Sequence, residues 1–328
     1  MDDQGIEHIP RQIYAVLFVF FLTTMAVVGQ ITILGKQVYD LTGREFDLGL
    51  IGLAEFAPTF ILAPFAGSLA DRMDRRKLLR WAMAGEAIVS VLLFLYARSE
   101  PTSILPIFLL VLTFGICRAF ASPSGRALTI DLAPLAVVPR VVALGSVSMQ
   151  AGLIVGPVIF GFLFVAAEPL PYLASAVALG AGVIILSMVS SSNVRKLETV
   201  GTRRAVKDAF EGFRFIRNTP MLFGAISLDL FAVLFGGAVA LLPAIAEDRL
   251  GVGAVGLGWL RASVGLGAGV VAVTLAIRPL QRHIGRILLV VVAIFGVSTI
   301  VLGLSRNYTV AFIAIFVLAA ADAVSMFI

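Results

Sequence analysis

Six ionisable side chains lie inside long apolar stretches of the sequence, where water cannot solvate them. They are four acids and two arginines, namely Glu55, Glu86, Arg118, Asp229, Arg261 and Asp322. A charged side chain at the centre of a bilayer costs at least about 2.5–3.5 kcal/mol, so each needs a partner or a water-filled cavity. Because acids outnumber bases, at least two carboxyl groups have no fixed cationic partner. A carboxyl group alone in a dry site takes up a proton, so these residues are candidate proton carriers.

Depth within the stretches separates the six residues. At a rise of about 1.5 Å per residue, Glu55 and Asp229 lie nearest the middle of their stretches, whereas Glu86, Arg118 and Asp322 lie nearer one end. We rank Asp229 first as a proton carrier, and we take Glu55, Arg118 and Asp322 as the other candidates for a proton or substrate site. The alternative for any of them is a structural ion pair, such as Glu86 with Arg118.

The composition excludes most other classes of protein. Hydrophobic residues make up 59% of the 328 residues and charged residues 14%, against about 45–50% and about 25% in a soluble domain. A soluble enzyme, a nucleic-acid-binding domain and a disordered chain are therefore excluded. One cysteine and two distant histidines give no disulfide or metal pattern, and no Walker-type phosphate loop occurs. We expect no enzymatic activity, no catalytic residue, no metal and no cofactor.

The apolar residues form ten stretches, each close to the roughly 20 residues that a membrane-spanning helix needs. They cover residues 13–35, 47–69, 79–97, 104–124, 141–165, 171–190, 220–245, 255–277, 287–304 and 309–328. The short alternating segments of a membrane barrel are absent from the sequence. The predicted fold class is therefore an all-α membrane protein with about ten transmembrane helices.

The basic residues predict the orientation of these helices. With the N-terminus in the cytoplasm, the inner loops hold 18 Lys and Arg residues and the outer loops hold 5. Cytoplasmic loops carry such an excess of positive charge, so we expect this orientation. The spread of charge over many loops also argues against binding of nucleic acid.

One basic loop divides the chain. Residues 191–219 carry seven Lys and Arg residues, and 206–216 are either an amphipathic helix on the membrane surface or a solvated linker. We predict three parts: an N-terminal six-helix bundle (1–190), a cytoplasmic basic connector (191–219) and a C-terminal bundle of four spans (220–328). A weak repeat between 67–77 and 278–286 also suggests two related halves.

The loop after the second stretch carries the most specific motif. It resembles the signature loop of the major facilitator superfamily, G-x-L-A-D-R-x-G-R-(K/R)-x, in Gly67, Leu69, Ala70, Asp71, Arg72, Arg75 and Arg76. The resemblance implies a conformational latch formed by Gly67, Asp71, Arg72, Arg75 and Arg76. We expect Gly67 to let two helix ends approach. Asp74 replaces the usual Gly of the turn, where Asp tolerates left-handed geometry.

A second motif lies in the fifth stretch. Gly152, Gly156, Pro157 and Gly161 resemble the span-5 motif G-x-x-x-G-P-x-x-G-G of proton-coupled exporters in this superfamily, with Phe162 in place of the last Gly. Gly152 and Gly156 share one helix face, which permits close approach of another helix. The alternative is ordinary packing of small residues, with no role specific to export.

Further segments narrow the resemblance to one branch of the superfamily. Residues 120–134, 228–243, 256–261 and 321–325 are similar to the enterobactin-exporter branch, which includes macrolide-efflux-like proteins. This implies a two-lobed bundle in which spans 1, 4, 7 and 10 line a cavity, with Arg118, Asp229 and Asp322 on the transport path. The family has six spans in each lobe, so we expect the chain to be truncated, lacking about two helices.

The resemblance also implies a function. We expect a monomeric secondary transporter of the bacterial cytoplasmic (inner) membrane that exports a hydrophobic small molecule, drug or siderophore in exchange for protons. Its partners would be the substrate, protons and the lipid bilayer. Uptake by substrate–proton symport and a transport-inactive scaffold or sensor are the alternatives.

Overall fold

The computed structural model describes residues 9–189, 237–278 and 284–327, with a few isolated residues between 214 and 228. Within these parts, nine helices are long and apolar enough to cross a membrane. They are α1 (Arg11–Thr42), α2 (Glu45–Arg72), α3 (Arg75–Arg98), α4 (Leu105–Leu132), α5 (Val138–Ala166), α6 (Leu170–Met188), α10 (Gly253–Ile277), α11 (Ile284–Leu304) and α12 (Tyr308–Phe327). They coincide with nine of the ten predicted stretches; most of the remaining one, 220–245, lies outside the described residues.

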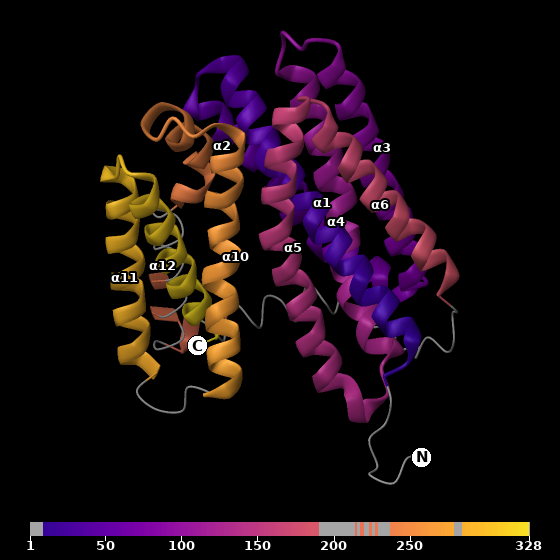
Figure 1. Cartoon of the computed structure of the whole chain (residues 1–328). Helices are drawn as coiled ribbons and strands as arrows, with labels where there is room; N and C mark the ends of the chain where they lie inside the picture. Colours follow the sequence, from indigo (N-terminus) through magenta and orange to yellow (C-terminus); the bar gives the residue numbers. More distant parts are fainter. Residues whose placement is uncertain are drawn as a thin grey trace.

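The helices form two bundles, which confirms the all-helical, two-lobed fold class (Figure 1). In the first bundle α1 packs on α5 and α6, α3 packs on α4 and α6, and α2 packs on α4. In the second bundle α10 and α11 both pack on α12. The predicted boundary between the bundles, at 191–219, falls outside the described residues apart from a few positions.

Short irregular helices precede α10 at the end of the second bundle that lies near α1. They are η2 (Gly237–Leu241), α9 (Leu242–Ala244) and η3 (Ile245–Arg249), and a single turn, η1 (Leu135–Val137), links α4 to α5. Leu242 and Ala246 are buried against α10 and α12. This packing places the carboxylates of η3 at the junction between the bundles.

Helix α5 joins the two bundles through contacts that only small residues permit. A Cβ atom at Gly156 would lie 2.5 Å from the Met25 carbonyl oxygen of α1, and one at Gly161 would lie 2.7 Å from the Ala254 carbonyl oxygen of α10. Such distances are too short for real side chains, so the backbones touch directly. Gly152 faces α1 in the same way, 2.7 Å from the Thr24 Cβ.

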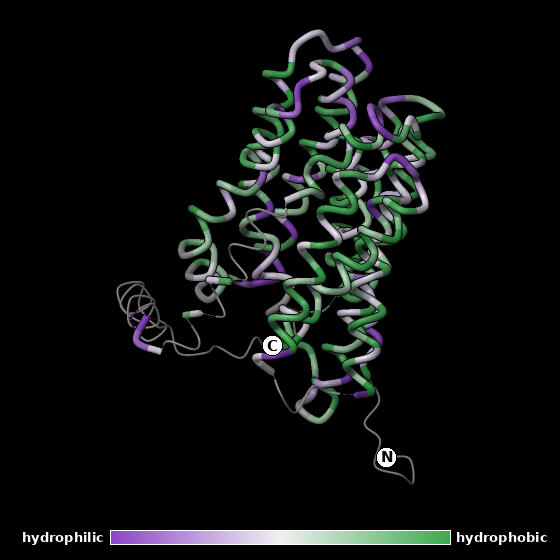
Figure 2. The backbone as a smooth tube through the Cα atoms, turned by 90° about the vertical axis from the view of Figure 1, so that its left-hand side faces the viewer, coloured by the Kyte–Doolittle hydropathy of each residue, from purple (hydrophilic) through white to green (hydrophobic). Residues whose placement is uncertain are grey.

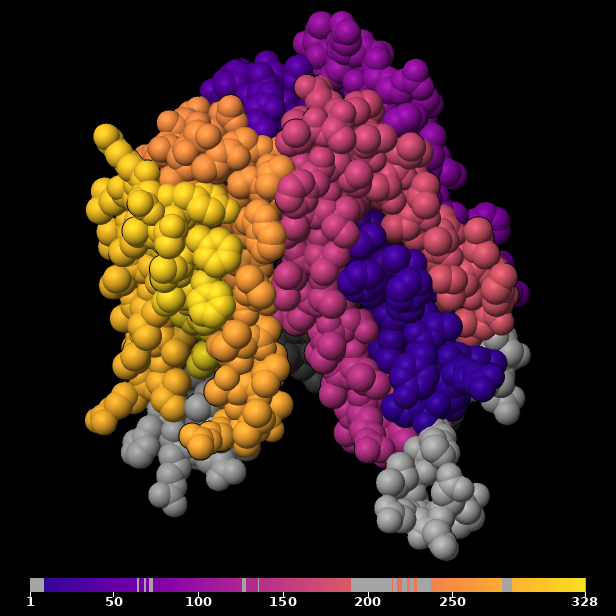
Figure 3. All heavy atoms as spheres, viewed as in Figure 1, coloured from indigo at the N-terminus to yellow at the C-terminus, as the bar shows by residue number. Residues whose placement is uncertain are grey.

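The two bundles meet at one end and separate towards the other. Along α5 and α10, close approaches extend from Gly161 beside Ala254 to Gln150 beside Gly269. Beyond these residues the helices diverge, and a hollow opens between them at the lower end (Figure 3). This lower end carries the C-terminal ends of α2, α4 and α10, where the distribution of basic residues predicts the cytoplasmic side.

The outer surface of the helices is apolar. Large side chains such as Phe60, Trp81 and Met188 are 70%, 69% and 80% exposed. Hydrophilic residues are concentrated at the turns near both ends of the molecule, and apolar residues cover most of the length between them (Figure 2). A bundle with this surface is suited to lipid, because in water such large apolar patches mark an interaction surface.

We predict that Gly156→Ala destabilises the protein. The added methyl group forces α1 and α5 apart, and overpacking of this kind costs about 1–3 kcal/mol. The melting temperature of the purified protein in detergent, measured by loss of the monodisperse chromatographic peak, should fall by several degrees. Gly180→Ala on α6 is the matched control, since a Cβ atom there would have no neighbour within 4 Å. Equal melting temperatures for both variants would contradict the direct α1–α5 contact.

Candidate functional site

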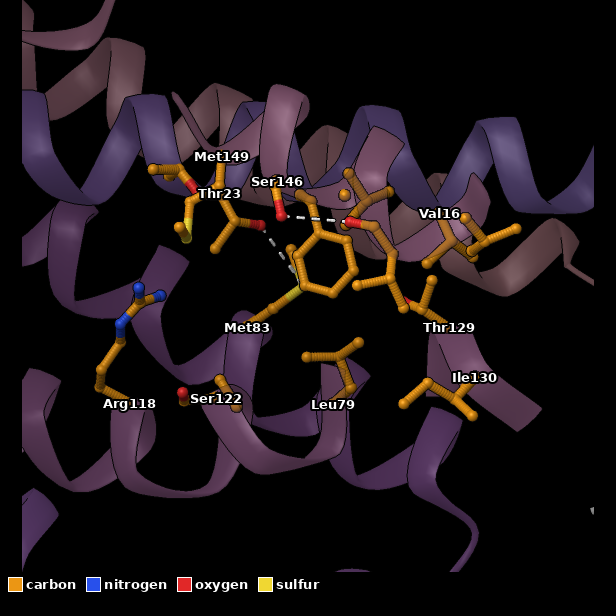
Figure 4. A pocket seen from close by; sticks show the side chains of 17 residues that line it. Val16, Thr23, Leu79, Met83, Arg118, Ser122, Thr129, Ile130, Ser146 and Met149 are labelled. Carbon is orange, nitrogen blue, oxygen red and sulfur yellow. Dashed lines mark hydrogen bonds between the residues drawn. The ribbon is translucent and has the colours of Figure 1, made fainter. Parts of the chain in front are cut away.

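Helices α1, α3, α4 and α5 enclose a cavity of about 400 Å³ in the first bundle. Its walls are mainly apolar, and five hydroxyl-bearing residues also line it, namely Thr23, Thr24, Ser122, Thr129 and Ser146 (Figure 4). Of the described residues that line it, Arg118 of α4 is the one with a charge. The volume falls within the range of about 300–1,000 Å³ that is typical of small-molecule sites.

Arg118 lies beside Glu86 without hydrogen bonding to it. The Arg118 Nη1 atom is 3.8 Å from the Glu86 Oε1 atom, which is too long for a hydrogen bond. Glu86 is fully buried, and within the described part of the chain neither of its carboxylate oxygens has a hydrogen-bond partner. The geometry therefore resembles the structural ion pair between Glu86 and Arg118 that we gave as an alternative. The N–H donors of Arg118, however, make no hydrogen bond to Glu86.

Glu55 extends this pair into a larger group. It is half-buried on α2, within electrostatic reach of Arg118 and of Arg261 on α10. Arg261 also donates a hydrogen bond to the Val239 carbonyl oxygen, at 2.8 Å. Glu86, Arg118, Glu55 and Arg261 thus form an intramembrane charge cluster that passes from the first bundle to the second. Arg261 was not among the predicted site residues, because its distance from Glu55 depends on how the bundles dock.

The remaining candidates from the sequence are Asp322 and Asp229. Asp322 lies on α12, in the second bundle, and is not among the residues that line the cavity. Asp229 lies outside the described residues. Of the four predicted proton or substrate residues, the structure therefore brings together Glu55 and Arg118.

Two arginines of the predicted latch, Arg75 and Arg76, bind within the first bundle. Arg75 donates two hydrogen bonds from Nη1 to the Asp131 carboxylate at the end of α4, at 2.9 and 2.8 Å. Arg76 donates to the last carbonyl groups of α6, to Leu186 at 2.7 Å and to Ser187 at 2.6 Å. These bonds attach the start of α3 to the C-terminal ends of α4 and α6. Asp131 belongs to a segment noted in the sequence, but nothing local marked it as the partner of Arg75.

Two details of the latch differ from expectation. Asp74 has φ −61° and caps α3 by accepting from the backbone N–H groups of Arg76 and Lys77, so it does not use left-handed geometry. A Cβ atom at Gly67 would meet no atom within 4 Å, so Gly67 permits no close approach in this conformation. The side chains of Asp71 and Arg72 are outside the description.

At the opposite end of the molecule, polar groups close the junction between the bundles. The Lys36 Nζ atom of α1 is 2.8 Å from Asp40 and 2.8 Å from Glu247 of η3, and the Tyr39 hydroxyl donates to Asp248. Lys36 is only 8% exposed. We call these five residues the outer closure. The sequence offered two signals for it, the i,i+4 spacing of Lys36 and Asp40 and the adjacent acids that follow an apolar stretch.

We predict that Glu247→Gln loosens the outer closure. The change removes a charge partner of Lys36, and about 1 kcal/mol of lost attraction corresponds to about a fivefold shift in the equilibrium. The probe is a cysteine at Ala244, which is buried against Tyr39 and Leu48, in a Cys117→Ala background. Its labelling by a membrane-impermeant maleimide in right-side-out vesicles should become about fivefold faster.

The matched control is Glu168→Gln, which neutralises an exposed acid at the same end of the molecule. It should leave the labelling rate of the cysteine at Ala244 unchanged. Identical rates for the two variants would show that the Lys36–Glu247 pair does not hold the bundles together.

Known proteins resemble the chain in sequence and in fold. Quinolone resistance protein NorA of Staphylococcus aureus is 26% identical over 194 residues, 59% of this chain and 48% of that protein. Multidrug resistance protein 1 of Bacillus subtilis (strain 168) is 30% identical over 187 residues, 56% of this chain and 47% of that protein. The chain thus spans about half the length of these curated relatives.

Among solved structures, nucleoside transporter NupG superposes with a TM-score of 0.71 at 13% identity, covering 97% of this chain and 80% of that one. A bacterial homolog of the human lysosomal transporter Spinster, in an inward-facing and unoccupied conformation, superposes with a TM-score of 0.68 at 15% identity, covering 98% and 74%. Both likenesses concern the fold. The family model of the Major Facilitator Superfamily matches residues 16–328, and the chain therefore belongs to this superfamily.

Proposed function

We propose that the protein is a secondary active transporter that exports a hydrophobic small molecule, drug or siderophore in exchange for protons. The observation that carries this proposal is the asymmetry of the junction between the bundles. The outer closure joins them at one end, and a hollow separates them at the other (Figure 3). Rocking of one bundle against the other would expose a central site to each side in turn.

The proposed membrane is the bacterial inner membrane, with the N-terminus in the cytoplasm and the hollow open to the cytoplasm. The excess of basic residues at that end supports this orientation. We propose the bundle boundaries 1–190 and 220–328 with 191–219 as the connector, and a monomer as the working unit. Export, rather than uptake, is favoured by the relatives named for drug resistance.

The two motifs have separate proposed roles. The proposed role of the latch is to stabilise one conformation of the transport cycle, through Gly67, Asp71, Arg72, Arg75 and Arg76. The hydrogen bonds of Arg75 to α4 and of Arg76 to α6 support this role, because they hold the start of α3 in place. The span-5 residues of α5 would act as the contact on which the bundles move. The finer assignment that we propose is the enterobactin-exporter and macrolide-efflux-like branch, based on the segments quoted above.

We predict that reconstituted protein accumulates norfloxacin, a quinolone, in vesicles with an acidic interior. Molecules whose cytoplasmic side faces outwards would carry norfloxacin inwards as protons leave. The measurement is uptake of the compound over time, with a protonophore that collapses the gradient and protein-free vesicles as controls. Accumulation driven by the opposite gradient would favour the symporter, and a panel of drugs and siderophores without any flux would favour the scaffold or sensor.

We predict that Asp229→Asn abolishes this accumulation more completely than Glu86→Gln. An amide at position 229 cannot exchange a proton, whereas Glu86 is buried beside Arg118 and does not line the cavity. Binding of norfloxacin should partly survive in Asp229→Asn. The second measurement is proton release when norfloxacin is added to purified protein. An Asp229→Asn variant that pumps and releases protons like the parent would place the coupling elsewhere.

A further inference from the structure

We infer that the cavity of the first bundle selects organic anions with an apolar body, and that Arg118 is the residue that determines this selectivity. The inference rests on the proposed transport function for its biological meaning, but it concerns binding alone. It assigns the sign of the substrate's charge, which the family membership leaves open. Three features carry it: the shape of the cavity, the donors of Arg118 and the position of the acids.

The cavity carries a charge at one end, and the other end is lined by aliphatic side chains and by Thr129, whose hydroxyl donates to the Gly125 carbonyl oxygen (Figure 4). Arg118 and Ser122 lie at one end, while Val16 and Ile130 lie at the opposite end, with Leu79 between them (Figure 4). A molecule that fills this space would place an apolar body against the aliphatic side chains and a polar head beside the guanidinium. The cavity therefore fits an amphiphile better than a uniformly polar solute.

The N–H donors of the Arg118 guanidinium are available to a ligand in the cavity. An arginine carries five N–H donors in a planar fork that matches a carboxylate or sulfonate. The nearest carboxylate, that of Glu86, is 3.8 Å from Nη1 and so does not occupy these donors by hydrogen bonding. The side chain is 27% exposed, so a ligand in the cavity can reach it. The hydroxyl of Ser122 on the same helix adds a neutral donor beside it.

The acids of the intramembrane charge cluster lie outside the cavity wall. Glu86 is fully buried behind Arg118, and neither Glu86 nor Glu55 is among the lining residues. They balance the charge of Arg118 at a distance, but they offer no oxygen to a bound cation. Among the described residues, a cation in the cavity would meet a guanidinium with no carboxylate to bind, whereas an anion would gain direct hydrogen bonds.

The test is equilibrium binding of three probes that share one aromatic body and differ in charge. We would use 2-naphthylacetate, 2-(2-naphthyl)ethanol and 2-(2-naphthyl)ethylammonium, each radiolabelled, with the 328-residue chain in nanodiscs and empty nanodiscs as the background. Flow dialysis gives the affinity of each probe without requiring transport. Charged hydrogen bonds predict that the anion binds about tenfold or more tightly than the alcohol, and the ammonium probe more weakly than either.

The variant Arg118→Gln should remove this preference, so that the anion binds no better than the alcohol. The neutral probe should keep its parental affinity, which shows that the cavity remains intact. Arg261→Gln is the matched control, because Arg261 is the other arginine of the cluster and does not line the cavity. It should retain the preference for the anion.

Three outcomes would overturn the inference: tighter binding of the ammonium probe, an anion preference that persists in Arg118→Gln, or no binding of any probe above the nanodisc background. If Arg118→Gln also fails to bind the alcohol, the substitution has disturbed the cavity. Arg118→Lys would then take its place, because lysine keeps the charge without the planar fork and should retain part of the preference for the anion. Anion-selective binding without flux would refute transport but support the selectivity. Flux confined to cationic compounds would support transport and refute the selectivity.

Discussion

The direct contact of the α5 backbone with α1 on one face and α10 on the other is the constraint on which the rest of the structure depends. Lipid provides no hydrophobic force between helices, so association relies on close packing of small residues. Gly156 and Gly161 provide that packing on the two sides of α5. Because Pro157 lies between them, the part of α5 that contacts both bundles lacks one backbone N–H donor.

The charges within the membrane follow from the same arrangement. Each of Glu86, Arg118, Glu55 and Arg261 would be expensive in hydrocarbon by itself. They come from α3, α4, α2 and α10, and they alternate in sign from one bundle to the other. The docking of the bundles therefore also determines which charges are compensated. A movement that separates α2 from α10 would leave Glu55 with Arg118 as its remaining cationic neighbour in the cluster.

The sequence predicted the helices well because hydropathy is a local property. The stretch 255–277 corresponds to α10 at Gly253–Ile277, and 309–328 corresponds to α12 at Tyr308–Phe327. The pairs between helices were not predictable in this way. Asp131 lies 56 residues from Arg75 and Glu247 lies 211 residues from Lys36, so those pairs depend on helix rotation and docking. The N-cap role of Asp74 was predictable in principle, since Asp is a preferred N-cap residue. The family motif has glycine at this position, and this favoured a left-handed turn instead.

The outer closure includes an ion pair between the two bundles, and in the proposed orientation this would make it responsive to the ionic strength of the external medium. The side chain of Lys36 is 10% exposed, while those of Asp40 and Glu247 are 38% and 46% exposed. Dissolved ions reach the two carboxylates and weaken their attraction to the lysine, since the screening length falls from about 30 Å at 0.01 M to about 8 Å at 0.15 M. In the proposed transport cycle, the energetic balance between the two orientations of the bundles would thereby be linked to the salinity on one side of the membrane.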